Sequence, residues 1–133
     1  MSKADKARAA LRLQDFGLNP GTPVVVYLHT PKEKVWGFLV STMAAGLVVR
    51  GMDLIAFEDW MRQEARGEDP LMGPSTVFYP MSRVERMEKD ETVGPIPSYC
   101  ERFRREVGRT VEEALGLTLT RDDEADDPGD DRS

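Results

Sequence analysis

A chain of 133 residues, 40% of them apolar and 32% charged, is long enough to bury one core and has the composition of a soluble globular protein. It contains no run of about 18 apolar residues, so a membrane-spanning helix is not expected. A single cysteine, Cys100, excludes an intramolecular disulfide. The N-terminus has no apolar signal-peptide core, and the expected location is the cytoplasm.

The net charge of −6 is concentrated at the C-terminus. Residues 121–133 contain seven acidic residues and two arginines, a net charge of −5, which leaves only −1 on the other 120 residues. A run of this kind lacks apolar residues and repels itself, so we expect a disordered acidic tail over residues 118–133. The tail either keeps the protein soluble or competes with an acidic ligand for a basic surface.

The first predicted elements are a helix and two strands. Residues 3–16 favour a helix because they are rich in Ala, Leu, Arg and Lys, and an Asn-Pro-Gly turn at 19–21 ends it. Residues 23–29 include four consecutive apolar residues, three of them β-branched, which is typical of a strand covered on both faces. The second strand, residues 34–42, has Gly37 at its centre. A glycine there indicates a bend or a close backbone approach, as a small barrel needs in order to close.

A third strand is predicted at residues 47–52, and an inserted helix follows it at about residues 54–64. Apolar residues within 54–64 recur at helical spacing, and Asp53 is a plausible N-cap. Residues 66–75 are rich in Gly and Pro and predict a loop.

Two further strands, residues 76–79 and 83–89, are separated by Pro80, which lacks a backbone donor. Beyond a Pro-rich linker, Ser98 and Glu101 have the spacing of a capping box, and the helix they begin is expected to end near Leu115. We therefore divide the chain into residues 1–90, a barrel with an N-terminal and an inserted helix; residues 91–117, a linker and C-terminal helix; and the tail.

The order helix, strand, bent strand with a central glycine, strand, strand, short turn and strand resembles the Sm-like fold, and most closely its bacterial Hfq branch. The matching residues lie in four strands: Pro23, Val24, Tyr27, Leu28, Lys34, Gly37, Leu47, Val48, Val49, Val77, Phe78 and Tyr79. The resemblance covers roughly residues 4–89. It implies a mainly β fold with flanking helices, a small five-stranded bent-sheet barrel. It also implies a homo-oligomeric ring, in which the fourth strand of one subunit pairs with the fifth of the next, and RNA binding.

The resemblance also suggests where RNA would bind. The Tyr-Lys-His run that lines the Hfq pore is Tyr79-Pro80-Met81 here, so the opposite face is the candidate. The candidate nucleic-acid-binding residues are Tyr27, Lys34, Trp36 and Arg50. An aromatic ring that stacks on a base contributes about 1–3 kcal/mol. The alternative is that Tyr27 is a core or interface residue and that Trp36 serves packing.

Signals of catalysis are absent from the sequence. There is no glycine-rich phosphate loop, no cluster of His or Cys metal ligands and no nucleophile motif, so neither an enzyme nor a cofactor is expected. The arginines at 102, 105 and 109 form a stripe that either contacts phosphates or pairs with the interleaved glutamates. Two function classes stay open: an RNA-binding ring, and a protein-interaction or scaffold module that has lost RNA binding.

Overall fold

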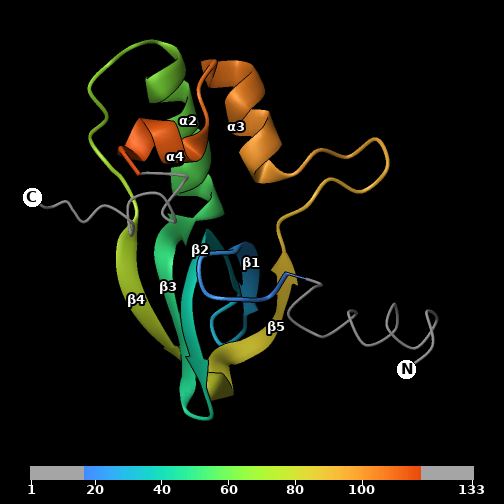
Figure 1. The fold of residues 1–133 in the computed structure, drawn as a ribbon. Helices are drawn as coiled ribbons and strands as arrows, with labels where there is room; N and C mark the ends of the chain where they lie inside the picture. Colours follow the sequence, from blue (N-terminus) through green and yellow to red (C-terminus); the bar gives the residue numbers. More distant parts are fainter. Residues whose placement is uncertain (1–16, 118–133) are drawn as a thin grey trace, which may run out of the picture.

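The computed structural model describes residues 17–117, which form one five-stranded antiparallel sheet and a group of helices (Figure 1). The strands are β1 (Pro23–Leu28), β2 (Glu33–Met43), β3 (Gly46–Asp53), β4 (Ser75–Pro80) and β5 (Val84–Lys89), in the order β4-β3-β2-β1-β5. The mainly β class and the five predicted strands are confirmed. The predicted helix at residues 3–16 and the predicted tail at residues 118–133 lie outside the described residues.

The predicted bend of the five-stranded sheet is confirmed, but within the described chain the sheet does not close into a barrel. β4 and β5 are the two edges of the sheet, and β5 pairs with β1 alone. A three-residue 3-10 helix, η2 (Met81–Arg83), links the two edges and spans at most about 15 Å. Arg83 also donates to the carbonyl oxygens of His29 (3.2 Å) and Pro31 (2.7 Å). The edges therefore converge at the η2 end, while no pairing joins them along their length.

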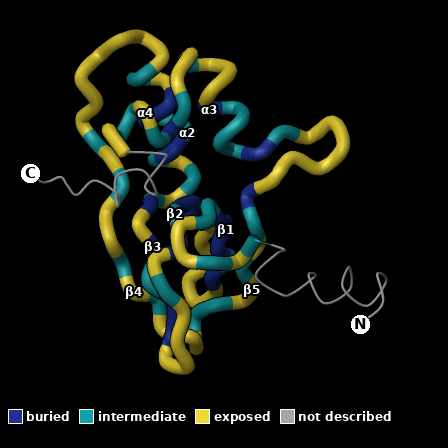
Figure 2. The backbone as a smooth tube through the Cα atoms, in the orientation of Figure 1, coloured by how far each residue is buried: buried dark blue, intermediate teal, exposed yellow. Residues whose placement is uncertain are grey.

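Two apolar clusters lie on the two faces of the sheet. The cluster inside the bend contains Val24, Val26, Leu28, Val35, Leu39, Leu47 and Val49. The cluster between the other face and the helices contains Val25, Trp36, Phe57, Trp60, Met61, Phe103 and Val111. Alternate residues of β1 enter different clusters because side chains alternate across a strand. Both faces of β1 are therefore covered, as its apolar run predicted (Figure 2).

The inserted helix α2 (Leu54–Ala65) begins as predicted, because the Asp53 side chain accepts a hydrogen bond from the Ala56 amide at 2.9 Å. It lies beside α3 (Tyr99–Val107) and, with α3 and α4 (Val111–Leu115), forms a layer over one end of the sheet (Figure 1). Among residues 17–117 no helix has both the length and the apolar character needed to cross a membrane.

The single helix expected to end near Leu115 is instead two helices, α3 (Tyr99–Val107) and α4 (Val111–Leu115). Gly108 adopts a left-handed conformation with φ 87° and ends α3. Thr110 and Glu113 then form a reciprocal capping box that begins α4. The break turns α4 back toward α2 and lets Val111 enter the cluster between helices and sheet.

Gly37 lies at a close approach between β2 and β3, directly opposite Gly51. A Cβ on Gly37 would lie 2.6 Å from the Arg50 carbonyl oxygen and 2.7 Å from the Gly51 Cα. Both neighbours are backbone atoms and cannot move aside without separating the strands. The glycine pair thus allows the sharp bend of the sheet, as the position of Gly37 in the sequence indicated.

Gly37→Val is expected to lower the free energy of unfolding by about 1–3 kcal/mol, because the new side chain forces the two strands apart. Urea melts of the full chain measure the effect. Gly73→Val is the matched control, since Gly73 is exposed and a Cβ there would contact nothing within 4 Å. Equal midpoints for the two variants would contradict a close approach at Gly37.

Candidate functional site

The four predicted binding residues lie on one face of the sheet, the face that the helices partly cover. Tyr27 stands opposite Lys34 across β1 and β2, and Trp36 stands opposite Val25 and Met52. Arg50 stands opposite Phe38. The sequence therefore predicted correctly which residues share a face, because the alternation along each strand is a local property. It did not predict that helices pack on this face.

Trp36 is not a surface residue, and its predicted role in stacking on a base is wrong. Its side chain is 0% exposed, with ring centroids 4.8 Å from Phe57 and 5.2 Å from Phe38. Its indole N–H donates to the Asp90 carboxylate at 3.1 Å. Helices α2 and α3 occupy the space above it, so Trp36 packs between the layers, as the alternative interpretation held.

Tyr27 is half-buried and lies within a group of charged side chains at the β1–β5 side of the sheet. The Arg86 guanidinium lies 4.1 Å and the Lys34 ammonium 5.4 Å from the centroid of its ring. Its hydroxyl donates to Glu88 at 3.1 Å, and Glu88 also pairs with Arg86 at 3.0 Å. Sequence reasoning missed Arg86 and Glu88, because only the register of β5 against β1 brings them to Tyr27.

Arg50 belongs to a different part of the same face. It donates to the Thr76 hydroxyl at 3.2 Å and lines a groove of about 780 Å³ with Phe38, Val40 and Leu115. Tyr27 lines a separate groove of about 580 Å³. The predicted residues thus do not form one site: Tyr27 and Lys34 are neighbours, Arg50 is apart, and Trp36 is buried.

A buried polar centre forms around the carboxylate of Asp90, which directly follows β5. It accepts hydrogen bonds from the backbone amides of Tyr99 (2.7 Å) and Cys100 (3.0 Å), and from the Trp36 indole. These two amides are at the N-terminus of α3, where a negative charge is favoured. No local pattern in the sequence indicates this contact, because Asp90 and Trp36 are far apart along the chain.

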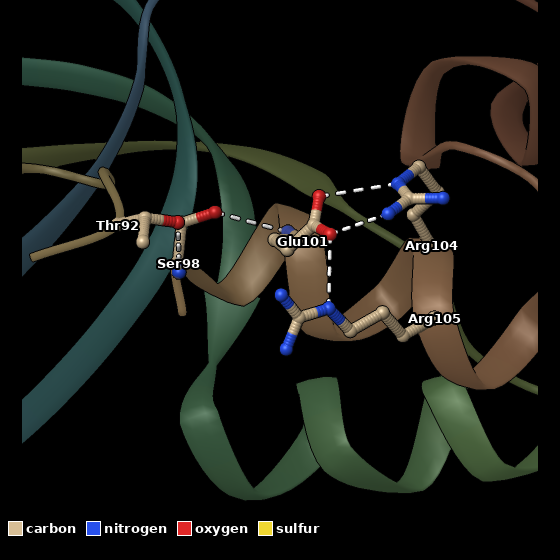
Figure 3. A network of polar contacts seen from close by, with 5 residues as sticks. All are labelled: Thr92, Ser98, Glu101, Arg104 and Arg105. Atoms are coloured by element: carbon tan, nitrogen blue, oxygen red, sulfur yellow. Dashed lines mark hydrogen bonds and ion pairs between the residues drawn. The ribbon is translucent and has the colours of Figure 1, made fainter. Parts of the chain in front are cut away.

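The N-terminus of α3 carries a second network (Figure 3). The Ser98 side chain accepts from the Glu101 amide at 2.9 Å, and its own amide donates to Thr92 Oγ1 at 3.1 Å. The N-cap prediction for Ser98 is therefore confirmed, but the Glu101 carboxylate pairs with Arg104 and Arg105. Hydrogen bonds from these two guanidinium groups lower the pKa of Glu101 to about 2.

The arginine stripe is ion-paired. Arg102 donates both terminal nitrogens to Glu58, at 2.8 and 2.9 Å, and Arg109 donates to Glu64 at 2.7 Å. These pairs join α3 and the segment after it to α2. The interpretation of the stripe as a paired helix face is confirmed, and its guanidinium groups are engaged within the chain.

The described residues offer little reactive chemistry. Between residues 17 and 117 no three His, Cys, Asp or Glu side chains are grouped so that they could hold a metal ion. Burial, and after it the charge of Asp90, raise the pKa of the Cys100 thiol well above its usual range. A neutral, half-buried thiol is a packing group. What the arrangement offers is surfaces for binding: the two strand edges and the grooves near Tyr27, near Arg50 and near Lys34.

Comparison of the chain with protein-family models, with curated proteins and with solved structures finds no match.

Asp90→Asn is expected to reduce the free energy of unfolding by about 1–3 kcal/mol, because one carboxylate oxygen becomes an N–H group that faces donors. Thermal or urea unfolding of the full chain, followed by tryptophan fluorescence, measures the change. Glu91→Gln is the control, because Glu91 is exposed and a surface change of this kind stays within about 0.5 kcal/mol. An Asp90→Asn variant as stable as the control would show that the three hydrogen bonds contribute nothing.

Proposed function

We propose that this protein is a non-catalytic interaction module of Sm-like type, which assembles with further copies of itself through the two edges of its sheet. The observation that carries the proposal is the pair of edge strands, β4 and β5. Each has six residues, and neither has a strand partner on its outer side among the described residues. An uncovered edge presents a row of backbone donors and acceptors that another strand can complete.

The side chains near the β4 edge support the same proposal. Phe78 in β4 is 48% exposed, and two exposed methionines, Met43 and Met81, lie near this end of the strand. The Met81 amide donates to the Ala45 carbonyl oxygen at 2.8 Å, which ties η2 to the β2–β3 turn. Exposed apolar side chains grouped at a strand edge are typical of a surface that a partner covers.

The pairing of β4 of one copy with β5 of the next is a head-to-tail contact. Contacts of this kind repeat and generate a ring when the rotation between copies closes. The Sm-like resemblance implies the same pairing of the fourth and fifth strands. The strand order β4-β3-β2-β1-β5 leaves these two strands free for it, which is why we favour self-assembly over a monomeric scaffold.

RNA binding is the second candidate function, because the charges of the described residues do not favour it. Acidic residues outnumber basic residues by 15 to 12 within residues 17–117. Of the nine arginines in this range, eight lie in ion pairs: Arg62, Arg66, Arg83, Arg86, Arg102, Arg104, Arg105 and Arg109. Binding to a phosphate backbone rests mainly on clustered, available Lys and Arg side chains.

Light scattering of the full chain is expected to give a mass that is a multiple of 15.0 kDa at micromolar concentration. Phe78→Lys should shift the protein toward the monomer, because a lysine on an edge strand opposes strand pairing. Ile55→Lys is the matched control: Ile55 is 78% exposed and belongs to α2 rather than to either edge strand. A monomer for the unmodified chain, or equal masses for the two variants, would contradict assembly through the edge.

RNA binding is kept as the second candidate because of Tyr27, whose ring lies beside the cations of Lys34 and Arg86. If this surface binds RNA, Tyr27→Ala should weaken binding of a short A-rich or U-rich RNA by about 1–3 kcal/mol. Removal of residues 121–133 should tighten binding at low salt. Fluorescence anisotropy at 50 mM salt measures both, with Ile55→Ala as the control. Absence of binding by the full chain and by the truncated chain would exclude this candidate.

A further inference from the structure

The groove beside Tyr27 is a surface that neither proposed function uses as a whole. It has a volume of about 580 Å³ and lies between β1, β5 and the loop that leads to α3. Its lining includes Leu18, Tyr27, Glu88, Val93, Ile96 and Tyr99. Tyr27 and Tyr99 both line it, and burial raises the pKa of the Tyr99 phenol.

The apolar rim of the groove is exposed although it is firmly held. Val93 is 63% and Ile96 67% exposed, on a turn whose two ends exchange backbone hydrogen bonds of 2.9 and 3.0 Å. The base of the same loop is fixed by Asp90 and by the Ser98–Thr92 hydrogen bond. Figure 1 shows this loop extended away from the body of the molecule. Apolar side chains presented in this way are typical of a docking surface.

The groove is also acidic. Glu88, Asp90 and Glu91 line it against one basic residue, Lys89. The carboxylate of Glu88, one of the lining residues, accepts a hydrogen bond from the Tyr27 hydroxyl. A groove lined by both apolar and acidic side chains suits a segment that carries both aliphatic and basic side chains.

We propose that the groove binds residues 3–16 of the protein's own chain. The described chain begins at Gly17, which lies so close to Lys89 that a Cβ there would be 2.4 Å from the ammonium nitrogen. The next residue, Leu18, lines the groove itself. The segment before Gly17 therefore starts at the groove, and a tether this short makes its local concentration millimolar or higher.

The composition of the segment complements the groove. It carries three large apolar residues near its end, Leu11, Leu13 and Phe16. Its four basic residues exceed its two acidic residues, which gives a net charge of +2. The helix that its sequence predicts would be about 21 Å long, enough to cover the rim from Leu18 to the Val93–Ile96 turn. The apolar residues would cover Val93 and Ile96 while the basic residues face Glu88 and Glu91.

The chain contains a built-in pair of probes for this proposal, because it has two isoleucines. Ile96 lies on the rim of the groove, and Ile55 lies on α2 outside it. In the full chain with ¹³C-labelled isoleucine methyl groups, a nitroxide at Ala9→Cys, in a Cys100→Ser background, should cause a loss of intensity of the Ile96 resonance. The Ile55 resonance should lose much less. Equal losses for the two methyl groups would overturn the proposal.

Further measurements test whether the occupant is this segment of the same chain and whether apolar contacts and charge hold it in the groove. Leu11→Asp should shift the Ile96 resonance and leave the Ile55 resonance in place. If both resonances move, the substitution has disturbed the whole fold, and the spin-label experiment, in which Leu11 is unchanged, decides whether the segment occupies the groove. Glu91→Lys, or an ionic strength of about 1 M, should weaken the paramagnetic loss at Ile96, since charges are then reversed or screened. In a mixture of labelled chains with separate spin-labelled chains, Ile96 should keep its intensity. A loss there would show that the occupant comes from another copy and would overturn the proposal.

Discussion

The packing of the helices on the sheet depends on the hydrogen bonds that the Asp90 carboxylate accepts. It sits at the end of β5 and holds the Trp36 side chain of the sheet and the first amides of α3 at once. A buried charge is tolerated there because it accepts three hydrogen bonds and lies at the positive end of a helix. One short side chain thus ties the start of α3 to the sheet.

The helix layer in turn decides which surfaces are left for partners. It covers the centre of the sheet face around Trp36 and divides what remains into a groove near Tyr27 and a groove near Arg50. The ion pairs between α2 and α3 occupy guanidinium groups that would otherwise be available to an anionic ligand. The strand edges stay uncovered. The same packing that buries the aromatic residues therefore covers the centre of the sheet face and leaves its periphery, above all the strand edges, for partners to bind.

Much of the fold was predictable because its signals are local. The strands follow from apolar runs and alternation, α2 from helical spacing and the Asp53 cap, and the bend from Gly37. The break at Gly108 was missed because a single glycine within a helical pattern is tolerated, and its left-handed conformation is decided by where Val111 must pack. Closure of the sheet could not be predicted from local signals, because it depends on whether distant edges pair. At the candidate site, the burial of Trp36 and the approach of Arg86 to Tyr27 could not be predicted, because the residues that contact them are remote in sequence.

Because of the break at Gly108, α4 can unfold locally while α3 and the sheet stay folded. A helix of five residues cannot persist in water by itself, and α4 contributes one fully buried side chain, Val111, to the core. Its backbone amides are therefore expected to exchange with solvent through local opening, at a lower free energy than those of β1 or β2. Leu115 of α4 lines the groove near Arg50. Opening of this short helix would widen that groove while the sheet stays folded, so the space offered there is a property of an ensemble of states.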